Sequence, residues 1–167
     1  YIDDISNRSK DLVESKRIEL DKCITDISNY SLDIAKVKTD IAELQKQVID
    51  QSKINDKHKK LHNMEAKLEN TCSKHKKDLS FFELHDDCPV CQQVIDKAYK
   101  STMIGKKKEK VLELESALDQ IDKEIKTSEM KLDNINKTMV TIREKELLIN
   151  RYETSIEEIE KQRVKLG

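Results

Sequence analysis

The sequence predicts an all-α protein, a long antiparallel coiled-coil hairpin that reverses direction once. Charged residues make up 39% of its 167 residues, and the chain has only two Gly and one Pro. Ordinary globular domains are roughly 25% charged and use many more turn-forming residues between their elements. Apolar residues also recur every seven positions on both sides of the single proline. This composition and this period are typical of long helices that bury one narrow apolar stripe.

The first arm is expected over residues 1–84. Its apolar residues occupy the a and d positions of a heptad repeat, the two positions of each seven that face a partner helix. A seven-residue period gives 3.5 residues per turn, slightly below the relaxed helix, so it predicts a left-handed supercoil. The a positions are Val13, Leu20, Ile27, Ile34, Ile41 and Val48, and the d positions are Cys23, Tyr30, Val37 and Leu44.

The stripe is interrupted at residues 51–60, where Ile54 is the only apolar side chain. The pattern resumes at Leu61, but Ile54 and Leu61 are one residue out of phase with Val48. Two interpretations are open: a point of bending in the arm, or a solvated stretch that remains helical. The second is favoured, because such discontinuities are common in long coiled coils.

Pro89 marks the only place where the chain is predicted to reverse. Proline cannot continue a helix interior, and it disfavours helical conformation in the residue before it. Asp86 and Asp87 add turn-favouring side chains immediately upstream. We therefore expect the apex of the hairpin at residues 85–94.

The second arm is expected over residues 95–167, and its heptad pattern is more regular. A bend at the Cys-Pro-Val-Cys turn predicts that facing residues have numbers adding up to about 179. That register places the lysine-rich residues 57–60 opposite Asp119 and Asp122, and this charge match favours the hairpin. The a positions are Ile104, Val111, Leu118, Ile125, Leu132 and Met139, and most d positions are filled by Leu114, Ile121, Ile135, Ile142, Ile149 and Ile156.

Cys88 and Cys91 flank the predicted bend and bring two sulfurs within reach of one metal ion. A structural zinc ion takes four ligands in a tetrahedron and prefers thiolates. Cys72 and Cys23 precede Cys88 by 16 and 65 residues, or ~24 Å and ~100 Å along a helix, too far to complete the site. The missing ligands are therefore expected from a second copy. The sequence predicts a homodimer with one Zn²⁺ per two chains, bound by four Cys thiolates.

Three histidines offer other metal-binding interpretations. His85, three residues before Cys88, would give a three-ligand site with one open position, as in catalytic zinc sites, but no catalytic cleft is predicted around it. His58 and His62 lie four residues apart on one helical face and could bind a metal weakly. For all three, a solvated histidine is the favoured interpretation.

Two further interpretations of the Cys-Pro-Val-Cys turn are open. Such a pair can act in thiol exchange, but that function is indicated by a neighbouring βαβ pattern, which this sequence lacks. Two cysteines without a function would leave their position at the only predicted bend unexplained. Metal binding is the favoured interpretation.

Apolar side chains surround the predicted bend. They are expected to form the core that caps one hairpin, a small contact face between two apices, or both. A patch of this size is far below the ~1,600 Å² of a standard interface, so zinc is expected to supply most of the association. The residues are Leu79, Phe81, Phe82, Leu84, Val90, Val94 and Ile95.

The remaining cysteines and a basic run receive structural interpretations. Cys23 falls at a d position and Cys72 lies in helical sequence, so both are expected to fill the core. Residues 106–110, Lys-Lys-Lys-Glu-Lys, could contact DNA. A solvated helix face paired with acids is favoured, because the net charge of −1 creates no general attraction to nucleic acid or acidic membranes.

The sequence offers no targeting or membrane segment. No apolar run approaches the ~18 residues of a membrane span, and no signal-peptide pattern is present. Irregularly spaced cysteines suit a reducing compartment, so a cytoplasmic location is expected. The chain begins at Tyr1 and ends at Gly167 in the middle of its pattern, so we expect a segment of a longer protein.

At Cys88, Pro89 and Cys91 the sequence resembles the zinc-hook segment of the SMC-like ATPases of DNA double-strand-break repair, which include SbcC-type proteins. Within this family it is most similar to the large subunits of T4-like bacteriophage recombination endonucleases. The family pattern is Cys-Pro-x-Cys at the apex of an antiparallel coiled coil, and Val90 fills the free position. The four-residue motif alone is weak, but at the centre of a 167-residue coiled coil it is specific.

The resemblance implies a zinc-dependent tethering module in a DNA-repair or recombination protein. The complete protein would form an ATPase head from its two ends and act with a nuclease subunit on DNA, in the host-cell cytoplasm if it is of phage origin. This segment has no G-x-x-x-x-G-K-[ST] motif and is expected not to be an enzyme. The alternative function is a metal-independent structural spacer that dimerises through its arms.

Overall fold

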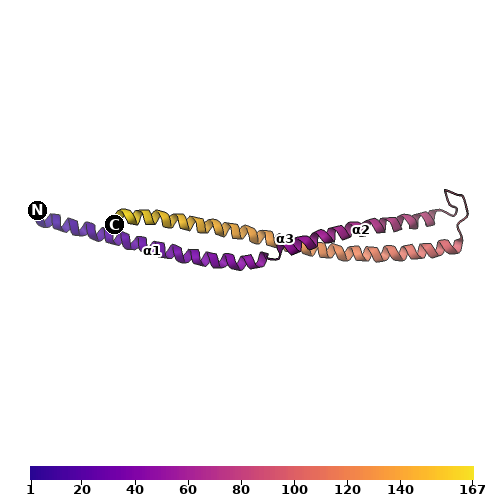
Figure 1. Cartoon of the computed structure of the whole chain (residues 1–167), viewed down its shortest axis with the longest axis horizontal. Coiled ribbons are helices and arrows are strands. Elements are labelled where there is room, and N and C mark those ends of the chain that lie inside the picture. The colour runs from indigo at the N-terminus through magenta and orange to yellow at the C-terminus, as the bar shows by residue number, and fades with distance from the viewer. The chain divides into compact units, whose positions relative to one another are not determined.

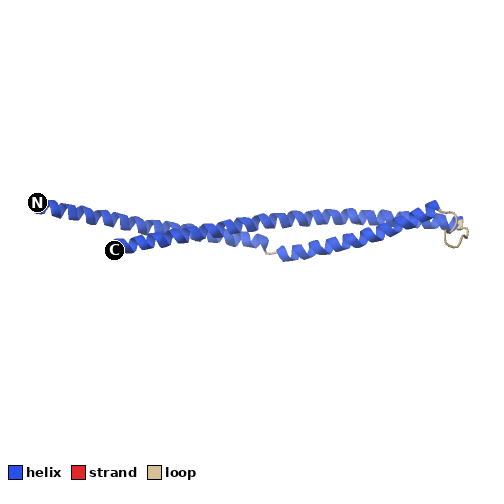
Figure 2. Cartoon of the chain, turned by 90° about the horizontal axis from the view of Figure 1, so that it is seen from above, coloured by secondary structure: helices blue, strands red, loops and turns tan.

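The computed structural model describes residues 1–167 and contains three helices and no strands. They are α1 (Ile2–Val48), α2 (Gln51–Leu84) and α3 (Lys97–Leu166) (Figure 1). Figure 2 shows the two non-helical connections, a short one between α1 and α2 and a longer one between α2 and α3. The all-α class predicted from the sequence is confirmed. None of the helices contains an apolar stretch long enough for a membrane span.

The chain divides into two compact units, and α3 contributes to both. The first unit comprises residues 1–49 and 135–167, so that α1 packs antiparallel to the last part of α3. The rings of Tyr30 and Tyr152 lie 5.5 Å apart across this pair. Its buried core consists of Val37, Ile41, Ile142 and Ile149, with Ile34, Leu44, Val48, Leu148 and Tyr152 packed against them.

The second unit comprises residues 50–134, in which α2 packs antiparallel to the first part of α3. Leu61, Ile121 and Ile125 form its buried core, and Leu68 packs against them. Ion pairs flank this stripe: Lys107 lies 3.0 Å from Asp78.

The buried residues confirm the heptad assignment. In α1 they are Cys23, Val37 and Ile41, all at predicted a or d positions. In α3 the buried a and d residues are Val111, Ile121, Ile125, Ile135, Ile142 and Ile149. No large side chain is fully buried, because a pair of helices covers each apolar stripe from one side only.

The predicted register of the two arms is wrong by six. The pairs Asp78–Lys107 and Asp40–Lys145 have numbers that add up to 185, not about 179. Inside the connection between α2 and α3, residues 85–96, hydrogen-bonded pairs such as Asp86 and Ile95 add up to 181, so its extra length accounts for two of the six positions. The rest arises where α3 begins, because Lys100 pairs with Asp86, and their numbers add up to 186. Asp122 consequently pairs at 3.0 Å with Lys126 of its own helix rather than with residues 57–60.

The same register explains a second correction, at Val13. This predicted core position is 64% exposed. In this register residues 1–17 would face positions numbered above 167. Leu20 is the first residue of α1 that is half-buried.

The discontinuity in the first arm is real, but it lies before the polar stretch. α1 ends at Val48, Ile49 and Asp50 form a turn, and α2 begins at Gln51. Residues 51–60 are helical throughout, which confirms the favoured interpretation of that stretch as solvated helix.

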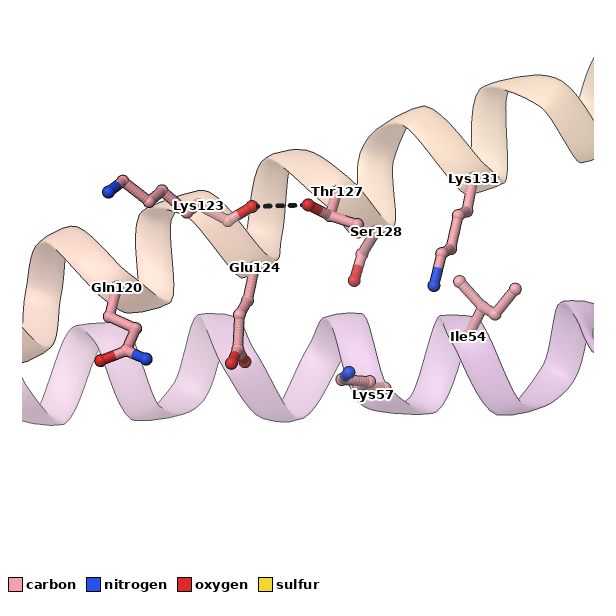
Figure 3. A pocket seen from close by; sticks show the side chains of 8 residues that line it. All are labelled: Ile54, Lys57, Gln120, Lys123, Glu124, Thr127, Ser128 and Lys131. Carbon is pink, nitrogen blue, oxygen red and sulfur yellow. Dashed lines mark hydrogen bonds between the residues drawn. The ribbon is translucent and has the colours of Figure 1, made fainter.

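Ser128 interrupts the stripe of α3 in the second unit. It occupies a d position where the pattern elsewhere places Ile or Leu, and it is only 4% exposed. Figure 3 shows its hydroxyl pointing toward α2, above Lys57. A pocket of about 310 Å³, partly open to solvent, lies here. Its lining is Ile54, Lys57, Gln120, Lys123, Glu124, Thr127, Ser128 and Lys131.

Candidate metal centre

The connection between α2 and α3, residues 85–96, is called the apex loop below. His85 leaves the helix in an extended conformation, with φ −122° and ψ 127°. The chain then reverses through hydrogen bonds that join the two sides of the loop. The N–H of Cys88 donates to the carbonyl of Gln93 at 2.8 Å, and the N–H of Ile95 donates to that of Asp86 at 2.9 Å.

A tight turn inside the loop holds the two cysteines. The N–H of Gln92 donates to the carbonyl of Cys88 at 2.7 Å, which closes a turn over Cys88, Val90 and Cys91. Gln92 has a φ of 60°, in the left-handed region that few non-glycine residues adopt. Proline preceded by an extended residue enters this turn without breaking a helical hydrogen bond. The local sequence therefore accounts for the turn.

The turn stabilises a thiolate at Cys88. The pKa of its thiol is lowered from the ordinary value because the backbone N–H groups of Cys91 and Val90 donate to the sulfur, and the Cys91 side chain adds a further hydrogen bond. Hydrogen bonds to the charged form of a group favour that form. Cys88 is half-buried and Cys91 is exposed, and both are free thiols. Two accessible sulfurs thus lie beside each other.

These donors fit half of a thiolate zinc site. Zinc prefers the thiolate form of cysteine, and backbone N–H groups directed at a ligand sulfur are the outer contacts that such sites use. The other two cysteines confirm their structural interpretation, because Cys23 is 5% and Cys72 is 4% exposed within the helices. Twelve residues of α2 separate Cys72 from the helix end, ~18 Å along the axis.

His85 does not join the cysteines. Its ring packs against Phe81, with centroids 5.0 Å apart. The structure brings three possible metal ligands together elsewhere, at His58, His62 and Glu129. The three-ligand interpretation of His85 with Cys88 and Cys91 therefore has no support in this geometry.

The apolar residues around the loop divide into two groups. Phe81 and Phe82 pack edge to face at 5.4 Å, and Phe82 contacts Tyr99 of α3 at 6.1 Å, so this group caps the hairpin. The sequence did not predict that Tyr99 joins this group, because it lies outside the heptad stripe. Leu84, Val90 and Val94 are instead 79%, 91% and 80% exposed. These three are called the exposed apex residues below, and they border the two cysteines in sequence.

Ion pairs fix the base of the loop. Lys100 of α3 contacts Asp86 at 2.7 Å, and its hydrogen bond and charge lower the pKa of that carboxyl. Lys107, Lys108 and Lys110 pair with Asp78, Glu83 and Glu113, respectively. For Lys108 and Lys110, which are exposed, the prediction of a solvated face paired with acids is confirmed. Lys107 is paired as well, but its side chain is only 18% exposed, so it lies in the interface rather than on a solvated face.

A comparison of the chain with protein-family models and with curated proteins found no match.

Proposed function

We propose that this chain is a zinc-dependent tethering module, in which Cys88 and Cys91 of two copies bind one Zn²⁺ and join their apex loops. The observation that carries this proposal is the pair of accessible thiols in a turn whose backbone N–H groups stabilise the thiolate of Cys88. One loop offers two sulfurs, and a structural zinc site requires four ligands.

A symmetric dimer meets this requirement with the fewest assumptions. In a two-fold dimer both partners use the same surface, so each contributes the same two cysteines. The zinc supplies the bonds that hold the two loops, and structural zinc contributes ~10–16 kcal/mol at neutral pH. The exposed apex residues support a contact at the same place, because three neighbouring apolar side chains otherwise remain in water.

The tether would serve a DNA-repair or recombination ATPase, as the resemblance to zinc-hook segments implies. In that role the ATPase head, the nuclease subunit and the DNA belong to other parts of the complete protein or to its partners. The segment itself would contribute length, a coupling at its end, and no enzymatic activity. A cytoplasmic location would keep its thiols reduced.

Sedimentation with metal analysis tests the proposal. The wild-type chain is expected to be a dimer that holds one more zinc per two chains than the double variant Cys88→Ser/Cys91→Ser. That variant, or a chelator added to the wild type, is expected to give monomers with unchanged helical circular dichroism. The matched control is Cys23→Ala/Cys72→Ala, which removes two thiols from the helices and is expected to keep the zinc and the dimer. A double-serine variant that remains dimeric would refute the proposal.

A second candidate function is a metal-independent spacer that dimerises through its arms. The observation that favours it is a group of exposed apolar side chains near the start of α1, namely Ile5, Leu12, Val13 and Ile18. If this surface makes the dimer, Leu12→Ser/Val13→Ser gives monomers and chelation has no effect. The same sedimentation experiment thus separates the two functions.

A further inference from the structure

We infer that the second unit carries another divalent-cation site, formed within one chain by His58 and His62 of α2 and Glu129 of α3. The ligand atoms of these three residues all lie within 4.8 Å of one another. This site is independent of the proposed zinc tether, because it uses no cysteine and no second copy.

The two histidines are already placed as a pair of ligands. Their Nε2 atoms lie 3.1 Å apart, and the rings meet edge to face with centroids at 4.5 Å. Two nitrogens that bind one tetrahedral zinc at ~2.05 Å are about 3.3 Å apart. The spacing of four residues produces this arrangement, because residues i and i+4 lie on the same face of a helix.

Glu129 supplies the third ligand from the opposite helix. It follows the buried Ser128, which places it at the edge of the interface between α2 and α3. Its side chain is exposed, so its carboxylate is free to turn toward the histidines. Sequence spacing alone could not indicate this residue, since 67 positions separate it from His62.

The surroundings favour imidazoles that act as ligands. A carboxylate oxygen of Glu65 lies 3.8 Å from Nδ1 of His62, where it can orient the ring and leave Nε2 for the metal. Carboxylates commonly orient metal-binding histidines in this way. Nδ1 of His58 is buried and has no hydrogen-bond partner in the chain, so no contact with the protein occupies this nitrogen.

The donor set defines the class of cation. Two imidazoles and one carboxylate suit Zn²⁺, and also Co²⁺, Ni²⁺ and Cu²⁺, whereas Mg²⁺ and Ca²⁺ require more oxygen ligands. Three protein ligands leave a coordination position for water. Because the ligands come from α2 and α3, a bound cation links the two helices about two turns after α2 begins.

The link would stabilise the paired helices of the second unit. A cation that binds only the folded pair shifts unfolding by mass action, by about 2.7 kcal/mol at a concentration of 100 times its Kd. Unfolded chains do not hold Glu129 beside the histidines, so the gain depends on all three ligands.

Calorimetric titration with Zn²⁺ tests the site in the Cys88→Ser/Cys91→Ser background, which has no sulfur ligands at the apex. One zinc per chain is expected, with a rise in melting temperature. His62→Gln is expected to abolish binding, and Glu129→Gln to weaken it at least tenfold. The matched controls are His75→Gln, whose ring accepts from Lys107 at 3.1 Å, and Glu124→Gln, both expected to bind zinc as the background does.

Co²⁺ provides a second measurement. Bound at this site, it is expected to show weak visible bands and no intense sulfur-to-metal charge-transfer band. A background chain that binds no zinc would overturn the inference. So would binding that is lost in His62→Gln but unchanged in Glu129→Gln, because two histidines of one helix would then suffice. Neither result bears on the tether, whose cysteines are absent from this background.

Discussion

Each unit pairs one helix, α1 or α2, with a different part of α3, and the two units differ in what their interface contains. The first unit has a continuous apolar core around Ile41 and Ile142, extended by Tyr30 and Tyr152. The second has a smaller core around Leu61 and Ile125 and a pocket beside the buried Ser128, whereas ion pairs join the helices of both units. Every candidate metal ligand lies in the second unit.

The first unit thus has the larger apolar core, whereas the second contains the candidate metal ligands. Where the heptad is unbroken, burial of apolar side chains holds the helices together, and no polar side chain is buried. Where it is interrupted, small and polar residues enter the interface and bring donor atoms of two helices close to each other. The second unit has fewer buried apolar side chains, and polar side chains that can bind a metal occupy positions along its helices. A cation bound to the folded unit would add to its stability.

Metal removal is expected to give the largest effect on stability, and to affect the second unit but not the first. Structural zinc contributes ~10–16 kcal/mol, so chelation should dissociate the apex loops and speed hydrogen exchange at Cys88, Gln92 and Ile95. Amides of the first unit should exchange at unchanged rates. Hydrogen exchange with mass spectrometry measures the rates in the apex loop and in the first unit. Faster exchange throughout residues 1–49 would show that metal removal also affects the first unit, contrary to this prediction.

Ile142→Ala is expected to have the next largest effect, confined to the first unit. Ile142 is 9% exposed within that core, and removal of a buried aliphatic side chain costs about 2–5 kcal/mol. Thermal unfolding should show the loss while the zinc content stays unchanged. Leu147→Ala, at a position 53% exposed on the same helix, is the control and should cost far less. Similar losses in both variants would indicate that the core assignment is wrong.

Ser128→Leu is expected to make the second unit more like the first. Leucine at this d position would fill the cavity and stabilise the chain by about 0.5–2 kcal/mol. Urea unfolding measures the change. Ser116→Leu, the same substitution at an exposed helical position, controls for the higher helix propensity of leucine. Destabilisation by Ser128→Leu alone would mean that the cavity is too small or too polar for the side chain.

Gly105→Ala is expected to stabilise the second unit slightly. The residue lies inside α3, and a Cβ placed there meets no atom within 4 Å. Alanine in a helix interior is favoured over glycine by about 0.8–1 kcal/mol. Gly167→Ala, outside the helices, should leave the midpoint of urea unfolding unchanged. A decrease in stability at Gly105 would reveal a contact on that face.

The smallest expected effect is a shift in the reactivity of Cys88. Because its folded pKa is lowered from 9.0, the thiolate persists to lower pH, and alkylation of the metal-free chain should reach half its maximal rate below pH 9.0. Because the folded turn favours the thiolate, the stabilisation that the thiolate gives the turn is lost as the pH falls through the folded pKa. A Cys23→Ala/Cys72→Ala/Cys91→Ser variant isolates Cys88, and urea should return its midpoint to that of an ordinary thiol.

The sequence by itself determined the features that depend on neighbouring residues. The seven-residue period identified the buried positions of α1 and the buried apolar positions of α3, because helical geometry alone decides which residues share a face. Pro89 and the two aspartates identified the place of reversal for the same local reason. The pairing of Cys88 with Cys91 also follows from their spacing of three residues.

Only the tertiary structure decided which residues meet across the helices. The register depends on the length of the apex loop and on how the start of α3 packs against the end of α2. The observed register moved the facing pairs by several positions, left Val13 exposed and placed Glu129 beside His58 and His62. The exact point of the break, at Ile49 and Asp50, was also decided there. A heptad fits its partner equally well at shifts of a whole repeat, so the apolar pattern alone leaves the register undetermined.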